Sequence, residues 1–287
     1  MTRRSGKGSE LSPAATLVRR HDRDRYQTAL FAPPAAREAL FALYAFNYEI
    51  ARVRESVREN MLGQIRLQWW REAVDTAYGG GPVRQHEIVA ALSATIREQA
   101  LTRAGFDRLI DARERDLDDA PPATLGELET YAEGSSAVLI ELALEVLGAA
   151  TPAAREAGRH VGIAYALTGL MRALPVHART GRFLIPADVA AEAGLDPGGY
   201  AALHSGPPLS RAVARVAGAA QRHLAAARGL RREVPQKALP ALLPARIAGN
   251  ALRRLERAGF DPFSDAVAAD DPLQIWRLTY AALVRRF

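Results

Sequence analysis

The chain has 287 residues, no cysteine, 48% hydrophobic residues and a formal net charge of +6. The lack of cysteine excludes disulfides, thiolate metal sites and cysteine nucleophiles, and the excess of arginine favours anionic partners. No apolar run reaches the roughly 18 residues of a transmembrane helix, and the N-terminus has no apolar signal core. We therefore expect a cytoplasmic protein whose basic surface contacts the inner face of the cytoplasmic membrane.

The pattern along the chain predicts helices only. Ala and Leu dominate, and no polar-apolar alternation persists over the length of a strand. Helix starts are indicated at Ser12-Pro13, at Thr124 with Glu127 three residues later, and at Thr151-Pro152. Further helices are predicted over residues 23–32, 39–56, 61–78, 83–104, 106–118, 209–232, 239–258 and 273–286. The fold class is therefore all-α.

Proline and glycine clusters mark the breaks between these helices. We expect breaks at residues 33–34, 79–82, 121–122, 175, 196–199 and 206–208. None of them is long or polar enough to be a domain linker. The sequence thus predicts one domain over residues 11–287, preceded by ten disordered residues.

The segment over residues 39–56 has the clearest periodicity in the chain. Leu43, Phe46, Ile50, Val53 and Val57 follow the three- and four-residue spacing that places side chains on one helix face. This segment is therefore predicted to be a core helix.

The same segment resembles a known family. Its Leu-Tyr-Ala-Phe at residues 43–46, the Gln-Trp-Trp-Arg-Glu at residues 68–72 and the stretch over residues 162–186 are similar to signatures of the squalene/phytoene synthases. The resemblance spans about residues 20–286. It implies an isoprenoid-synthase helical bundle, in a single domain, around a central cavity.

Both Asp-rich motifs of that family are degenerate here. In the first, the matching segment holds Asn47, Tyr48, Ala51, Arg52 and Glu55, with only Glu55 acidic among the three aspartate positions. The three aspartate positions of the first motif are Ala51, Arg52 and Glu55. In the second motif, Gly169 stands at an asparagine position, Arg172 is kept, and Ala173 and His177 stand at the two aspartate positions. Family members use these aspartates to bind Mg²⁺ on a prenyl diphosphate, and Mg²⁺ needs oxygen ligands. The resemblance thus implies a protein with no catalytic residues, no metal and no cofactor.

An alternative hypothesis is that the protein is an active enzyme. An active prenyl transferase, joining two isoprenyl diphosphates head to head with Mg²⁺, would need Glu55, Glu49 and other acids to rebuild the metal site. Nothing in their spacing demands this.

Three further segments point to one branch of the family. Residues 170–177, 131–136 and 253–263 are similar to the branch that includes a mitochondrial complex I assembly factor and its alphaproteobacterial relatives. This resemblance implies a role in the assembly of respiratory complex I at the membrane surface. The expected partners are complex I subunits or assembly intermediates.

The predicted cavity could bind an anion without metal. Cationic and aromatic candidates for its lining are Arg52, Trp69, Tyr131, Arg172, His177 and Arg182. Trp69 and Trp70 are about 100° apart on a helix, so one is predicted to pack in the core and the other to face the cavity. The expected ligand is anionic, isoprenoid or lipid-like.

Other charged patterns have simpler explanations. Asp111, Glu114 and Asp118 share a helix face, and Glu141 and Glu145 are one turn apart; both groups are interpreted as solvated faces. The arginine-rich helix over residues 209–232 is interpreted in the same way, with membrane docking as the alternative. No nucleic-acid motif is present and no aromatic residues interleave with the arginines, so nucleic acid is not an expected partner.

Overall fold

Helices form all the regular structure in the computed structural model, which describes residues 11–57, 59–196, 198, 200 and 205–287. The ten N-terminal residues predicted to be disordered, and part of the predicted break at 196–199, lie outside the described residues. The helices are α1 (Pro13–His21), α2 (Arg23–Ala29), α3 (Pro34–Ala51), α4 (Asn60–Gly79), α5 (Glu87–Gln99), α6 (Arg103–Glu114), α7 (Leu125–Ala132), α8 (Val138–Val146), α9 (Pro152–Arg179), α10 (Ala187–Ala193), α12 (Pro207–Gly229), α13 (Leu239–Leu242), α14 (Pro244–Arg257), α15 (Asp265–Ala268) and α16 (Gln274–Leu283). The described residues contain no strand, as the sequence predicts.

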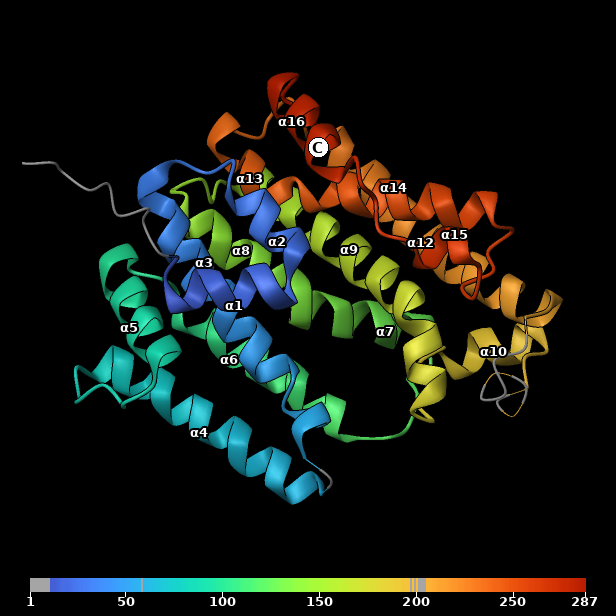
Figure 1. The fold of residues 1–287 in the computed structure, drawn as a ribbon, viewed down its shortest axis with the longest axis horizontal. Helices are drawn as coiled ribbons and strands as arrows, with labels where there is room; N and C mark the ends of the chain where they lie inside the picture. The colour runs from blue at the N-terminus through green and yellow to red at the C-terminus, as the bar shows by residue number, and fades with distance from the viewer. Residues whose placement is uncertain (1–10, 58, 197, 199, 201–204) are drawn as a thin grey trace, which may run out of the picture.

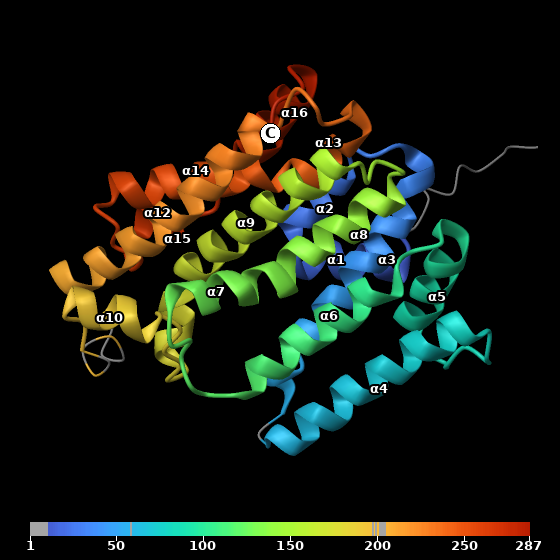
Figure 2. The same cartoon turned by 180° about the vertical axis from the view of Figure 1, so that it is seen from behind.

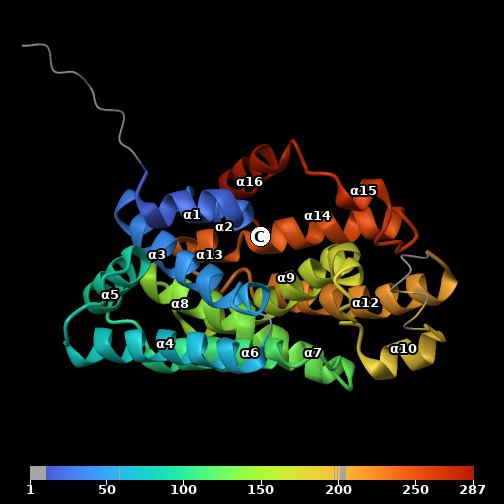
Figure 3. The same cartoon turned by 60° about the horizontal axis from the view of Figure 1, so that its bottom comes forward.

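The 28-residue helix α9 is the axis of the bundle. It packs against α12 and α14 on one side and against α7 and α8 on the other, as Figures 1 and 2 show. Figure 3 shows the bundle from its edge, with α1, α2, α14 and α16 above α9 and with α4, α6 and α7 below it. Helix α9 therefore contacts the helices on both sides of the bundle.

The three predicted helix starts are confirmed by their capping hydrogen bonds. Ser12 Oγ accepts from the Ala15 amide at 3.1 Å, and Thr151 Oγ1 accepts from the Ala154 amide at 3.3 Å. Thr124 Oγ1 accepts from the Glu127 amide at 3.2 Å. These side chains satisfy amides that the first turn of a helix leaves without partners.

The predicted break at Pro175 is wrong, since α9 continues to Arg179. Proline removes one backbone hydrogen bond and disfavours a helix interior by about 3 kcal/mol. Buried Leu174 and Ala178 pack this part of the helix into the core, and the Thr180 hydroxyl bonds the last carbonyls. Tertiary packing therefore outweighs the local preference of proline.

Other predicted helices are shorter than expected. The segment over residues 39–56 is helical only to Ala51, after which a 3₁₀ turn covers Arg54–Ser56. The helix predicted over 83–104 begins at Glu87 and ends at Gln99, where Ala100 adopts a positive φ of 49°. The helix predicted over 239–258 is divided at Leu243, because Pro244 starts a new helix.

The stripe on α3 is buried as predicted. Phe46 is fully buried and lies between Trp70 of α4 and Phe106 of α6, at ring-centroid distances of 5.5 Å to each. Edge-on aromatic pairs of this kind add to the stability that apolar burial provides. The core therefore fixes α3 against α4 and α6.

A close backbone approach fixes α9 against the π-helical turn η3 (Glu133–Ala137). A Cβ atom at Gly162 would lie 2.3 Å from the Ala137 Cα atom, so only glycine fits there. Segments of π-helix occur often at functional sites. Here the turn carries Ser135 and Ser136 to the interior.

Candidate functional site

A cavity of about 250 Å³ lies beside α9. Its lining comes from α2, α6, α7, η3, α9 and α14. Tyr165 and Arg172 are shared with a larger, more polar cavity of about 330 Å³, and Tyr131 and Leu170 are shared with a third of about 250 Å³. We refer to the first as the central cavity.

Arg25 connects the two helices that carry the family signatures. Its guanidinium lies 5.0 Å from the ring centroid of Tyr165 on α9 and 6.0 Å from that of Tyr44 on α3. Arg25 Nη1 also donates to Asp22 Oδ2 at 2.7 Å. Burial alone would lower the pKa of Arg25, but Asp22 and the two tyrosines raise it above its usual value. Arg25 is therefore a permanent, largely buried cation at the cavity wall.

Arg113 of α6 is a second, largely buried cation, with a side chain that is 13% exposed. It donates to Tyr131 Oη at 2.9 Å and pairs with Asp116 at 3.2 Å, while Tyr131 Oη donates to Asp116 at 2.8 Å. Burial raises the pKa of Tyr131 despite the opposing effect of Arg113, so the phenol stays protonated. Asp116 and Tyr131 thus hold the guanidinium at the cavity.

The central cavity is lined by guanidinium groups and by no carboxylate. These groups belong to Arg25, Arg113 and Arg172, which pair with Asp22, Asp116 and Asp24 outside the lining. Two buried polar atoms of this lining, Arg113 Nε and Ser136 Oγ, have no hydrogen-bond partner among the described residues. Buried polar atoms are nearly always bonded, so each of these exceptions indicates a group that can serve a ligand. The arrangement fits an anion that accepts hydrogen bonds.

The residues of the first motif lie at the end of α3. Arg52 is about half exposed, pairs with Glu49 at 3.3 Å and covers the ring of Tyr48, which stacks on His21. Ala51 ends the helix, and Glu55 is exposed on the following 3₁₀ turn. Buried Asn47 keeps its Oδ1 atom without a partner among the described residues. Arg52 is not among the residues that line the three cavities.

Three of the four residues of the second motif lie at the central cavity. Gly169, Arg172 and Ala173 line it, and a Cβ atom at Gly169 would meet no atom within 4 Å. Arg172 lies 3.9 Å from Asp24. His177, one turn further along α9, is half-buried, and burial together with the cation of Arg182 lowers its pKa.

Four of the six predicted cavity residues lie outside the central cavity. Trp69 lies at the outer side of α4, where Arg84 covers its ring at 5.0 Å and His86 packs on its edge. His177 and Trp69, like Arg52, are absent from the linings of the three cavities. Arg182 lines the third cavity rather than the central one and donates to the Asp116 carbonyl at 3.4 Å. Tyr131 and Arg172 lie at the central cavity.

The motif positions do not fit Mg²⁺. Ala51, Ala173 and Arg52 offer no oxygen ligand, and His177 offers only ring nitrogens, whereas Mg²⁺ takes oxygen donors. In the described part of the chain, no group of three or more histidine and acidic residues is placed to hold a metal ion.

The acids of the larger cavity are also engaged. Asp22 pairs with Arg25, and Asp24 accepts from Tyr165 Oη at 3.2 Å and from Gln274 Nε2 at 2.7 Å. Asp270 and Asp271 pair with Arg23 and Arg277, respectively. The nearest carboxylates therefore already have cationic or hydrogen-bonding partners.

The remaining acidic patterns are structural. Arg71 of α4 bonds both Asp111 and Glu114 of α6, at 2.9 and 2.7 Å, while Asp118 lies beyond the helix. The prediction that Glu145 lies on a solvated face is wrong. Its side chain is 10% exposed and accepts from the Thr102 amide at 2.9 Å, at the start of α6.

Comparisons with known proteins agree with the fold. A sequence profile described as squalene/phytoene synthase matches residues 18–279. The chain is 32% identical to assembly factor 6 of NADH dehydrogenase (ubiquinone) complex I from Bos taurus, over 92% of this chain and 81% of that protein. It is 26% identical to a presqualene diphosphate synthase from Rhodopseudomonas palustris, over 59% and 60% of the two chains.

A solved structure extends this agreement to three dimensions. A dehydrosqualene synthase in complex with ligand superposes with a TM-score of 0.82, at 16% identity, over 95% of this chain and 94% of that one. The all-α bundle is thus the fold of that enzyme. Given the profile match and the bovine relative, the chain belongs to the squalene/phytoene synthase family.

Proposed function

We propose that this protein is a non-catalytic member of its family that acts in the assembly of respiratory complex I at the membrane surface. The proposed partners are subunits or assembly intermediates of complex I. The observation that carries the proposal is the replacement of carboxylates by Ala51, Arg52, Ala173 and His177 in both motifs of a fold that still encloses a cavity. The bovine relative named as a complex I assembly factor supports the same role.

The central cavity, in this proposal, binds an anionic, lipid-like ligand without metal. Arg25, Arg113 and Arg172 supply the positive charge that Mg²⁺ supplies to a bound diphosphate in an enzyme. Leu170, Ile247 and Ala251 supply an apolar wall for a hydrocarbon chain. The cavity therefore retains binding and loses the groups that ionise a prenyl diphosphate.

A genetic experiment tests the assembly role. The gene is deleted in its host, and assembled complex I is measured on native gels together with NADH:quinone activity in membranes. We expect both to fall and to recover when the wild-type gene returns. Normal complex I in the deletion strain would overturn the proposal.

A binding experiment tests the cavity. Farnesyl diphosphate is titrated into the protein in EDTA, and we expect heat of binding. The variant Gly169→Leu fills free space and should weaken binding at least about tenfold, with Glu55→Gln on the exposed turn as the matched control. A wild-type protein that gives no heat would rule out this ligand class.

An activity assay separates the proposal from the enzyme alternative. The protein is incubated with labelled farnesyl or geranylgeranyl diphosphate, Mg²⁺ and NADPH beside an active family enzyme. We expect no pyrophosphate release and no condensed product. Turnover would show that Glu55, Glu49 or other acids rebuild a metal site, and would replace the non-catalytic reading.

A further inference from the structure

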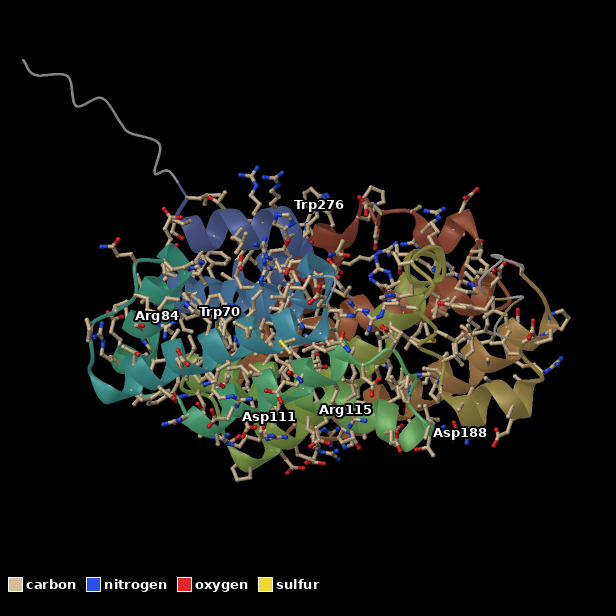
Figure 4. The ribbon with its side chains drawn as sticks, turned by 90° about the horizontal axis from the view of Figure 1, so that it is seen from below. Trp70, Arg84, Asp111, Arg115, Asp188 and Trp276 are labelled. Carbon is tan, nitrogen blue, oxygen red and sulfur yellow. The ribbon has the colours of Figure 1, made fainter. Side chains whose placement is uncertain are left out.

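Helix α16 presents an apolar stripe to solvent. Leu273, Trp276, Tyr280 and Leu283 recur at three- and four-residue spacing, and their side chains are 52%, 70%, 62% and 77% exposed. Figure 4 shows Trp276 at the outer edge of the molecule, whereas Trp70 lies within the helices. Exposed apolar groups that form one continuous stripe, rather than scattered positions, indicate an interaction surface.

The opposite face of α16 fixes it to the bundle. Leu278 and Ala281 are buried and pack with Leu243 and Ile247, and Phe31 covers this small cluster. At its first residue, Gln274 donates to Asp24 at 2.7 Å and to Gln27 at 2.9 Å. The stripe is therefore displayed by an ordered helix, and the contacts that hold it do not use the exposed residues.

Exposed cations lie on the same side of the molecule as the stripe and directly after it in the chain. Arg19 and Arg20 are in the last turn of α1, which lies on the same side of the molecule as α16 in Figure 3. Arg285 and Arg286 follow α16, and Arg285 lines a small cavity together with Arg231. None of these five arginines forms an ion pair with a described residue. Their charge is available to a partner.

We propose that the α16 stripe is a membrane-binding face that inserts into the headgroup region of a bilayer containing anionic lipids. Trp and Tyr favour this region because their rings are apolar with one polar tip. A helix with an apolar stripe beside unpaired arginines matches the interfacial class, which combines apolar insertion with attraction to lipid phosphates.

This inference deepens the membrane part of the proposed function, and its test is independent of complex I and of the cavity. In the part of the chain that the structure describes, no helix is long and apolar enough to cross a membrane. The stripe would therefore hold the protein at the surface of the bilayer, with α16 parallel to it.

Vesicle flotation tests the proposal with the full chain. Vesicles of equal parts phosphatidylcholine and phosphatidylglycerol should carry the protein upward, and vesicles of phosphatidylcholine alone should carry much less. The double variant Trp276→Glu with Leu283→Glu should reduce binding to the anionic vesicles at least about tenfold, because it removes two inserted side chains and adds negative charge.

The chain offers a matched control on another helix. Met61 and Ile65 of α4 are 68% and 58% exposed, so Met61→Glu with Ile65→Glu makes the same change in charge and polarity elsewhere. We expect this control to bind vesicles as the wild type does. Circular dichroism melting checks that both double variants are folded. Equal losses in the two variants would overturn the assignment to α16.

Fluorescence quenching tests the orientation directly. Lipids brominated near the headgroup should quench the wild-type emission, and the conservative variant Trp276→Phe should bind vesicles but lose that quenching. Quenching that persists without Trp276 would overturn the proposal. Binding that is absent in anionic vesicles would also overturn it, as would a concentration-dependent dimer that the Trp276→Glu, Leu283→Glu variant abolishes, since a second copy would then cover the stripe.

Discussion

The two motif segments have diverged in different ways. At the end of α3, the replacing residues have become part of the surface, with Arg52 paired to Glu49 and Glu55 exposed. On α9, the replacing residues Gly169 and Ala173 still face a cavity. A cavity can therefore persist where the motif positions carry no carboxylates. Here, cations from α2 and α6 line the interior that the second motif still borders.

The largest effect should come from removing a cation at the cavity. Arg113→Ala leaves Asp116 and Tyr131 buried without their guanidinium, and such a loss costs about 3 to 5 kcal/mol of the free energy of unfolding. Arg52→Ala, in the first motif, removes a surface ion pair and should change the free energy of unfolding by less than about 1 kcal/mol. Urea denaturation measures both. Equal losses would show that the two segments are not as different as their environments indicate.

Two glycines of α9 sharpen the comparison within one helix. Gly162→Ala forces a Cβ atom into the Ala137 backbone and should destabilise the fold by about 1 to 3 kcal/mol. Gly169→Ala adds the same atom to free space and should stabilise the helix by about 0.5 to 1 kcal/mol. Thermal melting gives the sign of each change. A destabilising Gly169→Ala would contradict the open space at the second motif.

The smallest effect concerns pH. Burial lowers the pKa of His177, and it also lowers the pKa values of His160 and His223, whose Nδ1 atoms lie 2.7 Å apart between α9 and α12. Below about pH 6.5 the unfolded chain binds these protons more readily than the native protein, so stability falls as the pH falls.

Melting temperatures between about pH 7 and about pH 5 measure this dependence. His177→Gln should flatten the decline in part, and His160→Gln with His223→Gln should flatten the rest of the histidine contribution. A variant that declines as steeply as the wild type would show that its histidine does not titrate differently in the two states.

Much of the fold could be predicted from the sequence because its signals are local. Ser12, Thr124 and Thr151 cap helices where the pattern places them, and the stripe through Phe46 is buried. The predicted break at Pro175 is wrong because the sequence shows only the local cost of proline in a helix. The packing of Leu174 and Ala178 against distant segments, which outweighs that cost, is not visible in the local pattern.

The site was predicted only in part. Arg172 and Tyr131, which the family resemblance indicates as cavity residues, lie at the central cavity, and so does Gly169 of the second motif. Arg25 and Arg113 were missed because each looks like an arginine on a charged helix. Their only local signal is an aspartate three residues away, Asp22 before Arg25 and Asp116 after Arg113. Tertiary packing covers these pairs, and their burial cannot be predicted from the residue pattern of a single helix.

We expect Pro175 to divide α9 in its dynamics. Its missing amide removes the hydrogen bond that would tie it to the turn before, so the last turn, with His177, has fewer ties to the long helix. The Tyr200 hydroxyl bonds the Leu174 carbonyl at 3.1 Å and secures the near side of this boundary. Amide hydrogen exchange should therefore be slow through Leu174 and faster from Val176 onward. We therefore expect the last turn, which carries His177 of the second motif, to open while the rest of α9 stays helical.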